Sequence, residues 1–193
     1  MIPNLWQKVY DGVLTSQTGD LINLLSKEII ANGPNEFTPV VKADISNDLA
    51  ITLKEINEFI TANLANFEVK SIYLEMNGFD INYDRWYFDY FAYENYSSDP
   101  EDLEWLCDWH SENWPETTIV GMEDTQDVFK WYHENHIWKS NPELKETYET
   151  AMLLVMLKFM DFVAKVIQRK KLVRPMPVLC TAHGFESVYQ IAP

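Results

Sequence analysis

The stretch VKSIYLEMNGFDINYDRWYFDYFAY, residues 69–93, decides the fold class because its apolar residues recur with a period of two. In its first half the apolar side chains occupy alternate positions, at Ile72, Leu74 and Met76. This spacing predicts a β-strand with one apolar face. A second run, residues 85–93, continues the pattern, so we expect an antiparallel hairpin.

The connection between the two strands contains a shift in the alternation. After Asn77-Gly78 the apolar residues are Phe79 and Ile81, so their parity has changed by one. We expect a bulge at Gly78 to absorb this shift and the turn to lie at residues 82–84. The alternative is that Asn77-Gly78 forms a tight turn itself, which would give a three-stranded meander.

The second strand carries aromatic side chains on both faces. One face, interpreted as core, holds Trp86, Phe88, Tyr90 and Ala92. The other face holds Tyr87, Asp89, Phe91 and Tyr93. Because a hairpin can turn only one face to a given core, the second face must meet helices, water or a partner.

Helical spacing dominates the rest of the chain. We expect helices over residues 18–32, 52–67, 98–114, 123–138 and 141–171, with a shorter one around residues 5–13. Short extended segments are expected over residues 36–45, 117–122 and 177–192. The helix over 141–171 is apolar almost all round, which is typical of a buried central helix. The sequence thus predicts one α+β domain spanning residues 1–193, in which helices cover an antiparallel hairpin or small sheet.

Acidic residues are concentrated in the middle of the chain. The net charge is -15, and residues 75–127 contain fifteen Asp or Glu against one basic residue, Arg85. A surface of this sign repels phosphate backbones, so we expect no nucleic-acid ligand.

The expected compartment is the cytoplasm. Two cysteines are too few for a disulfide scaffold, and the first residues lack the basic and apolar regions of a signal peptide. The longest apolar run, residues 151–157, ends at Lys158, whereas a membrane span needs about 20 residues. We therefore expect no membrane association.

Two motifs suggest metal chemistry. Asp80, Asn82 and Asp84 have the spacing of a calcium loop, but its required glycine and glutamate are replaced by Arg85 and Phe91. The second motif consists of two pairs of residues, each three apart on a predicted helix. The pairs are Cys107 with His110 and His133 with His136. If the two helices packed together, these four side chains could bind zinc, although histidines on such helices are more often packing residues.

No motif of an enzyme is present. The chain lacks a GxSxG elbow, a glycine-rich phosphate loop and an HExxH helix. Cys180 and His183 are also three apart, but on a strand they would point to opposite faces. We expect no catalysis and no cofactor, and the metalloprotein or hydrolase with the four-residue zinc site remains the alternative.

Aromatic and acidic residues together favour a binding surface. Six of the seven tryptophans fall between residues 86 and 138, largely within the acidic segment. Aromatic side chains dominate interface hot spots, and surrounding acids steer a basic partner. The residues we expect to contact a partner are Tyr87, Asp89, Phe91, Tyr93, Trp105, Asp108, Trp109 and Glu112.

In size, charge and aromatic content the chain resembles the immunity proteins that protect bacterial cells from a nuclease or another toxin. The resemblance implies a non-catalytic protein that neutralises or regulates a basic partner, such as a toxin.

Overall fold

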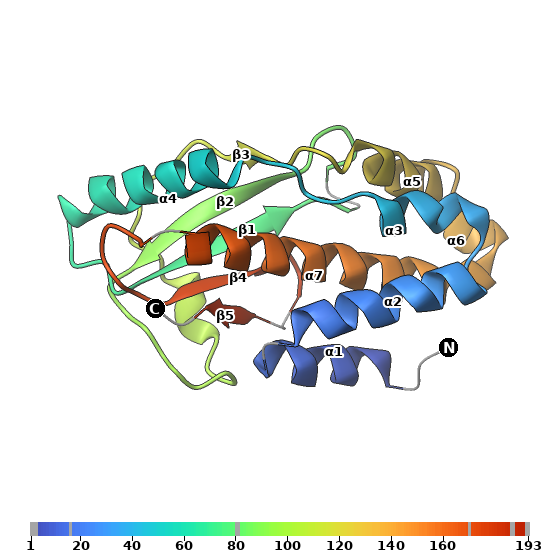
Figure 1. Cartoon of the computed structure of the whole chain (residues 1–193), viewed down its shortest axis with the longest axis horizontal. Helices are drawn as coiled ribbons and strands as arrows, with labels where there is room; N and C mark the ends of the chain where they lie inside the picture. Colours follow the sequence, from blue (N-terminus) through green and yellow to red (C-terminus); the bar gives the residue numbers. More distant parts are fainter. Residues whose placement is uncertain (1–3, 16, 80–81, 170, 186–187, 192–193) are drawn as a thin grey trace.

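The computed structural model describes residues 4–15, 17–79, 82–169, 171–185 and 188–191. Its elements form a five-stranded mixed sheet packed against helices, which confirms the α+β class (Figure 1). The α-helices are α1 (Leu5–Leu14), α2 (Thr18–Asn32), α3 (Thr38–Lys42), α4 (Leu49–Leu64), α5 (Glu123–Glu134), α6 (Ile137–Ser140) and α7 (Lys145–Arg169). The strands are β1 (Ser71–Asn77), β2 (Tyr87–Tyr93), β3 (Thr117–Thr118), β4 (Val178–Ala182) and β5 (Tyr189–Ile191). Short 3-10 helices are η1 (Asn35–Phe37), η2 (Glu104–Cys107) and η3 (Pro142–Leu144).

Strand β1 lies at the centre of the sheet, whose order is β3-β2-β1-β4-β5. It pairs antiparallel with β2, from Ser71 opposite Tyr93 to Asn77 opposite Tyr87, so the predicted hairpin is confirmed. Its other neighbour, β4, runs parallel to it. The chain reaches β4 only after α5, α6 and α7, as a parallel pair requires a long crossover.

The predicted bulge at Gly78 is wrong, and so is the alternative tight turn. Strand β1 ends at Asn77 and β2 begins at Tyr87, so residues 78–86 form the connection. A Cβ atom on Gly78 would lie 3.0 Å from the Trp86 ring, which is completely buried. Glycine therefore leaves room for this ring. Ile81, which belongs to the parity shift, and Asp80, the first residue of the possible calcium loop, lie outside the described residues.

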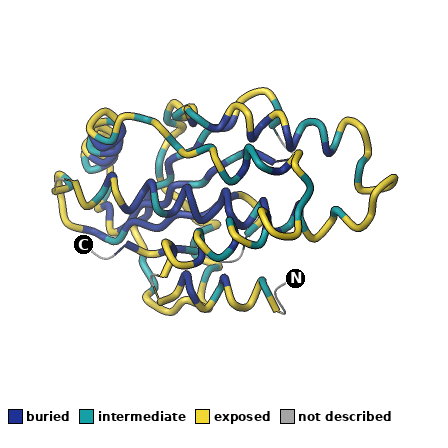
Figure 2. Tube along the Cα trace, turned by 45° about the vertical axis from the view of Figure 1, so that its right-hand side comes forward, coloured by how far each residue is buried: buried dark blue, intermediate teal, exposed yellow. Residues whose placement is uncertain are grey.

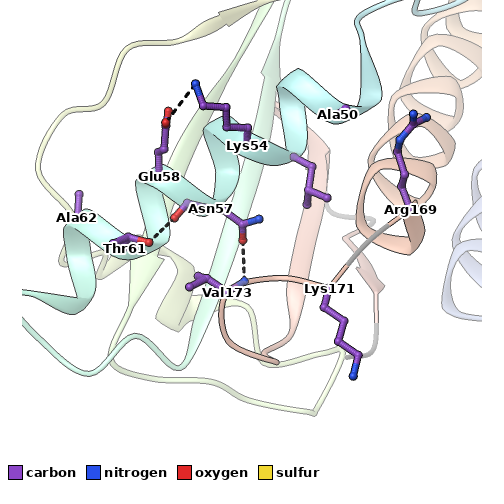
Figure 3. Close-up of a pocket in the computed structure, with 10 residues that line it drawn as sticks. Ala50, Lys54, Asn57, Glu58, Thr61, Ala62, Arg169, Lys171 and Val173 are labelled. Atoms are coloured by element: carbon purple, nitrogen blue, oxygen red, sulfur yellow. Dashed lines mark hydrogen bonds and ion pairs between the residues drawn. The ribbon is translucent and has the colours of Figure 1, made fainter.

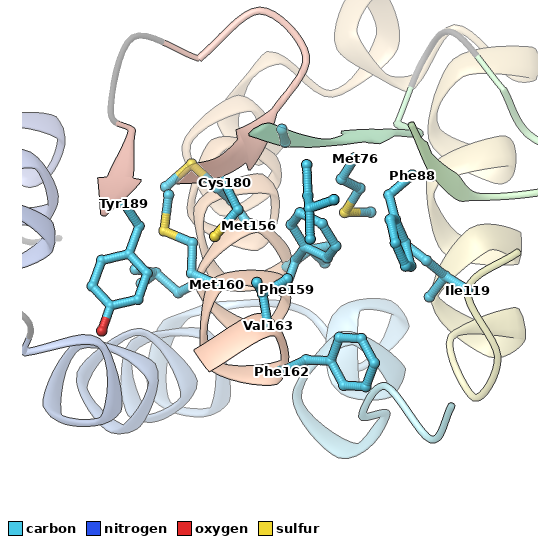
Figure 4. Close-up of a cluster of buried hydrophobic side chains, with 14 of the residues drawn as sticks. Met76, Phe88, Ile119, Met156, Phe159, Met160, Phe162, Val163, Cys180 and Tyr189 are labelled. Carbon is cyan, nitrogen blue, oxygen red and sulfur yellow. The ribbon is translucent and has the colours of Figure 1, made fainter. Parts of the chain in front are cut away.

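Helix α7 is the centre of the core, as predicted. It runs across the sheet and packs against α2, α4 and β4, and the tube coloured by burial is dark along most of its length (Figures 1 and 2). Figure 4 shows its side chains meeting those of the strands; the labelled examples are Met156, Phe159, Met160 and Val163 of α7 and Met76, Phe88 and Cys180 of the sheet. Within the described residues no helix is long and apolar enough to cross a membrane.

Lys158 is the buried cation of this core, with only 5% of its surface exposed. Its Nζ donates hydrogen bonds to the carbonyl oxygens of Val40 (3.0 Å), Val41 (3.1 Å) and Ala43. These carbonyls lie at the C-terminal end of α3, where a helix leaves acceptors without intrahelical donors. Burial lowers the pKa of Lys158, and Asp44 partly opposes this shift.

The segment 36–45, predicted to be extended, is instead helical through η1 and α3. Pro39 lies in the first turn of α3, where its missing N–H is not required. Phe37 and Val40 are completely buried in the main core. Tertiary packing and the Lys158 ammonium therefore override the β-branched composition of this segment.

The predicted helix over residues 98–114 is also wrong, because only the single 3-10 turn η2 forms there. Local side chains satisfy its first amides, since Asp99 Oδ1 accepts a hydrogen bond from the Glu101 amide (3.0 Å). Further along, the His110 amide donates to the Ala92 carbonyl oxygen of β2 (2.9 Å). The segment thus bonds to the edge of the sheet rather than to itself.

The helix predicted over residues 123–138 is divided into two. Helix α5 ends at Glu134, and α6 begins at Ile137. Between them His136 has a φ of 50°, a left-handed conformation that interrupts the helix. Val128, Phe129 and Tyr132 are buried as expected, and Ile137, which lies in α6, is partly buried against the same core.

We predict that Lys158→Met lowers the free energy of unfolding by about 3 kcal/mol, because it removes the donor to three carbonyl oxygens near the end of α3. Urea unfolding would measure this change. Lys165→Met is the matched control on the same helix, because Lys165 is exposed and forms an ordinary surface ion pair with Asp161. Its expected cost is about 0.5 kcal/mol. Equal costs for the two variants would contradict the role assigned to Lys158.

Candidate functional site

A recess of about 240 Å³ lies beside β2, where aromatic and acidic side chains converge. We call it the acidic recess. Its lining residues are Asp89, Tyr90, Phe91, Trp109, Ser111, Glu112, Asn113, Trp114 and Glu116. They come from only two stretches of chain, the middle of β2 and the segment 109–116.

The segment 109–116 is attached to β2 at both of its ends. At one end the Ala92 amide donates to Ser111 Oγ (3.1 Å), in addition to the bond between His110 and Ala92. At the other end β3 pairs with β2, Thr117 opposite Phe88. The recess lies between these two attachments, so its shape depends on hydrogen bonds that only the folded sheet provides.

Three aromatic side chains that are not buried, those of Phe91, Trp109 and Trp114, line it together with buried Tyr90. Phe91 meets Trp109 edge to face, with ring centroids 5.3 Å apart, and its other contact is a stacked one with Tyr73 at 5.8 Å. Trp114 packs edge to face on Phe59 of α4 at 5.5 Å. Trp109 remains 51% exposed, so it is the ring that the recess presents to solvent.

Carboxylates crowd around Asp89. Burial raises the pKa of Asp89, and repulsion from Glu116 and Glu75 raises it further, while Arg85 opposes the shift. Glu75 lies directly opposite Asp89 in the β1–β2 pairing, an arrangement that is unfavourable for like charges. Asn77 Nδ2 donates to Asp89 Oδ2 (2.6 Å). These groups leave the negative charge only partly compensated.

Arg85 and His183 lie at the margins of this cluster. Arg85 forms an ion pair with Glu116, and its guanidinium carbon lies 4.9 Å from the centre of the Tyr87 ring. The hydrogen bond from Arg85 lowers the pKa of Glu116. On the opposite side, His183 Nδ1 lies 2.5 Å from Glu75 Oε1. The Arg85 guanidinium thus contacts both a carboxylate and a tyrosine ring beside the recess.

The structure brings half of the expected partner-contacting residues together. Asp89, Phe91, Trp109 and Glu112 line the acidic recess. Tyr87 lies beside it under Arg85, and Asp108 is exposed next to Trp109 in the chain. The sequence does not single out Trp114 and Glu116 as lining residues, because the pairing of β3 with β2, which brings them to Asp89, has no local signal in the chain.

Tyr93 and Trp105 belong to a second, smaller apolar cluster and not to the recess. Tyr93 has no exposed surface, and its hydroxyl donates to the Leu106 carbonyl oxygen (3.0 Å). Trp105 meets the Tyr93 ring edge to face at 5.0 Å. Tyr93 is therefore covered by η2 and cannot contact a partner as expected. Trp105 is partly buried, and its ring holds η2 on the sheet.

The four residues of the alternative zinc site are not arranged as one. Cys107 is exposed in η2, and His110 lies beside Phe67, with its Nε2 3.9 Å from Glu94. His133 Nε2 is instead 2.6 Å from the Tyr148 hydroxyl. No group of three or more His, Cys, Asp or Glu side chains in the described part of the chain could hold a metal ion. The expected arrangement does not form, because Cys107 and His110 lie on no common α-helix and α5 ends at Glu134, between His133 and His136.

No protein-family model matches this chain, and neither the curated proteins nor the solved structures include a match.

We predict different costs for truncating two neighbouring tryptophans. Trp105→Ala should lower the free energy of unfolding by about 2 kcal/mol, because the ring joins η2 to Tyr93. Trp109→Ala should change it by no more than about 0.5 kcal/mol, since half of this ring is exposed. Chemical denaturation distinguishes the two variants. A large loss for Trp109→Ala would show that this ring is part of the core.

We predict that Asp89→Asn changes the pH dependence of stability. The raised pKa of Asp89 means that the folded state binds more protons than the unfolded state above the ordinary aspartate pKa of about 3.9. The unfolding free energy of the wild type should therefore fall, relative to that of the variant, as the pH rises from about 3.5 to about 7. Urea midpoints at both pH values measure this, with Asp108→Asn as an exposed control. A wild type that gained stability relative to Asp89→Asn would contradict the prediction.

Proposed function

We propose that this chain is a non-catalytic binding protein that holds a basic protein partner at the acidic recess. The observation that supports the proposal is the partly compensated cluster of carboxylates at Asp89 beside the aromatic side chains of the lining. A lysine or arginine of the partner would relieve the repulsion between Asp89, Glu75 and Glu116. Exposed Trp109 would supply the apolar contact that interface hot spots require.

The class of partner that we favour is a toxin, in keeping with the likeness to bacterial immunity proteins. The excess of acids in residues 75–127 would accelerate encounter with a basic toxin and would reject acidic competitors. Neutralisation in this proposal is steric, because binding covers a functional surface of the toxin, and it takes place in the cytoplasm.

We predict that Trp109→Ala weakens the complex about 30-fold, the loss expected for a hot spot of about 2 kcal/mol. Glu112→Lys should also weaken the complex, because it reverses a charge at the recess. The loss of affinity should be larger in low salt than in high salt, where the charge is screened. The test is calorimetric titration with the product of the gene immediately upstream, or with a basic protein that co-purifies with the tagged chain.

Two controls match these variants. Trp138→Ala removes a ring that is 47% exposed on α6 and is not part of the lining of the recess, and Glu143→Lys reverses an exposed charge in η3. Both should bind as the wild type does. Unchanged affinity in Trp109→Ala and Glu112→Lys, or equal losses in the controls, would refute the proposed surface.

A further inference from the structure

A second open groove of about 650 Å³ lies between α4 and the chain that follows α7. Its lining differs from that of the acidic recess, because small, apolar and basic side chains predominate. The lining residues are Ala50, Leu53, Lys54, Asn57, Glu58, Thr61, Ala62, Arg169, Lys171 and Val173. Figure 3 shows α4 along one side, with Arg169 and Lys171 extending from the other side. We call it the basic groove.

The groove is held open by polar contacts that fix both of its sides. Asn57 Oδ1 accepts a hydrogen bond from the Val173 amide (2.7 Å), which ties the segment after α7 to α4. Thr61 Oγ1 donates to the Asn57 carbonyl oxygen (2.7 Å), so this hydroxyl is directed to the helix backbone. The bond between Val173 and Asn57 therefore joins the two sides of the groove in the isolated chain.

The apolar surface of the groove is exposed in part. Val173 is 53% exposed, whereas Leu53 is 4% exposed and forms part of the floor. Ala50 and Ala62 carry small side chains, so a peptide backbone could approach α4 closely. The lining of α4 from Ala50 to Ala62 spans about 18 Å, the length of five or six extended residues.

The charge of the groove is opposite to that of the chain as a whole. Lys54 is paired with Glu58 at 3.4 Å, so these two charges largely offset each other. In the described part of the chain neither Arg169 nor Lys171 forms an ion pair. The nearby carboxylate of Asp48 caps α4 by accepting hydrogen bonds from the Ala50 and Ile51 amides (2.7 and 3.0 Å). These two hydrogen bonds, and to a smaller extent the charge of Arg169, lower the pKa of Asp48. Arg169 is therefore partly compensated, and Lys171 is the other cation of the lining, in a protein whose net charge is -15.

We propose that the basic groove binds an acidic, amphipathic peptide segment of a partner protein. Its aliphatic side chains would lie over Leu53 and Val173, and its carboxylates would pair with Arg169 and Lys171. A peptide is favoured over a fatty acid because the groove is open along its length, whereas an alkyl chain is usually enclosed on most sides. The proposal is independent of the function assigned to the acidic recess, since the two sites share no lining residue.

The test uses a fluorescein-labelled peptide in which pairs of Glu alternate with pairs of Leu, with fluorescence polarisation as the readout. The wild-type protein should bind it in low-salt buffer and release it as sodium chloride is added. Combined Arg169→Glu and Lys171→Glu substitutions should weaken binding at least about tenfold, because two attractive contacts become repulsive. Val173→Ser should weaken it less, through the loss of apolar contact.

The matched control is the pair Lys8→Glu and Lys27→Glu, which changes the net charge equally at exposed positions of α1 and α2. It should keep the wild-type affinity within about twofold. Equal losses in the control would overturn the proposal, because binding would then report only net charge. A peptide with Ser in place of Leu that binds equally well would also overturn it.

Two further measurements distinguish the peptide from two other possible ligands of the groove. If sodium oleate displaces the peptide and binds more tightly, the groove is a lipid site and the proposal fails. If light scattering shows a dimer of the wild type that the Arg169→Glu, Lys171→Glu variant loses, the occupant is a second copy of the chain and the proposal also fails. Circular dichroism establishes that each variant is folded before any of these comparisons is made.

Discussion

The burial of α7 is the constraint on which the rest of the structure depends. This helix is apolar on nearly every side, so it requires contacts all around it. The sheet covers one side, while α2 and α4 cover others. Lys158 extends from this helix to the end of α3 and satisfies carbonyl oxygens that would otherwise be left without donors. A single buried cation thus explains why residues 38–42 are helical despite their β-branched composition.

The edge of β2 determines the form of the acidic segment in the same way. Residues 98–114 have an amphipathic pattern, but β2 offers free backbone groups at Ala92 and Phe88, and the chain binds to them. A strand edge that is covered in this manner is protected from pairing with other chains. The covering segment also brings Trp114 and Glu116 opposite Asp89 and so builds the acidic recess.

Charge is divided between two surfaces of the molecule. The acids of residues 75–127 gather at the β2 edge and in the segment that covers it, whereas Arg169 and Lys171 follow the end of α7 at the basic groove. Helix α4 separates the two regions, because it packs on Trp114 by one side and lines the groove by another. The two proposed binding surfaces therefore differ in charge and share no lining residue.

The sequence by itself determined the hairpin, the buried helix α7 and the helices α2 and α4, because each has a clear hydrophobic period. It also predicted an extended segment over residues 177–192, where β4 and β5 lie. It also singled out four residues that line the acidic recess, since aromatic and acidic residues coincide in that part of the chain; they are Asp89, Phe91, Trp109 and Glu112. Only the tertiary structure decided whether residues 98–114 and 36–45 would be helical, because their hydrogen-bond partners are distant in the chain. Tyr93 and Trp109 show the same limit: both are aromatic residues near acids, yet one is buried under η2 and the other is exposed, a difference set by which segment covers each ring.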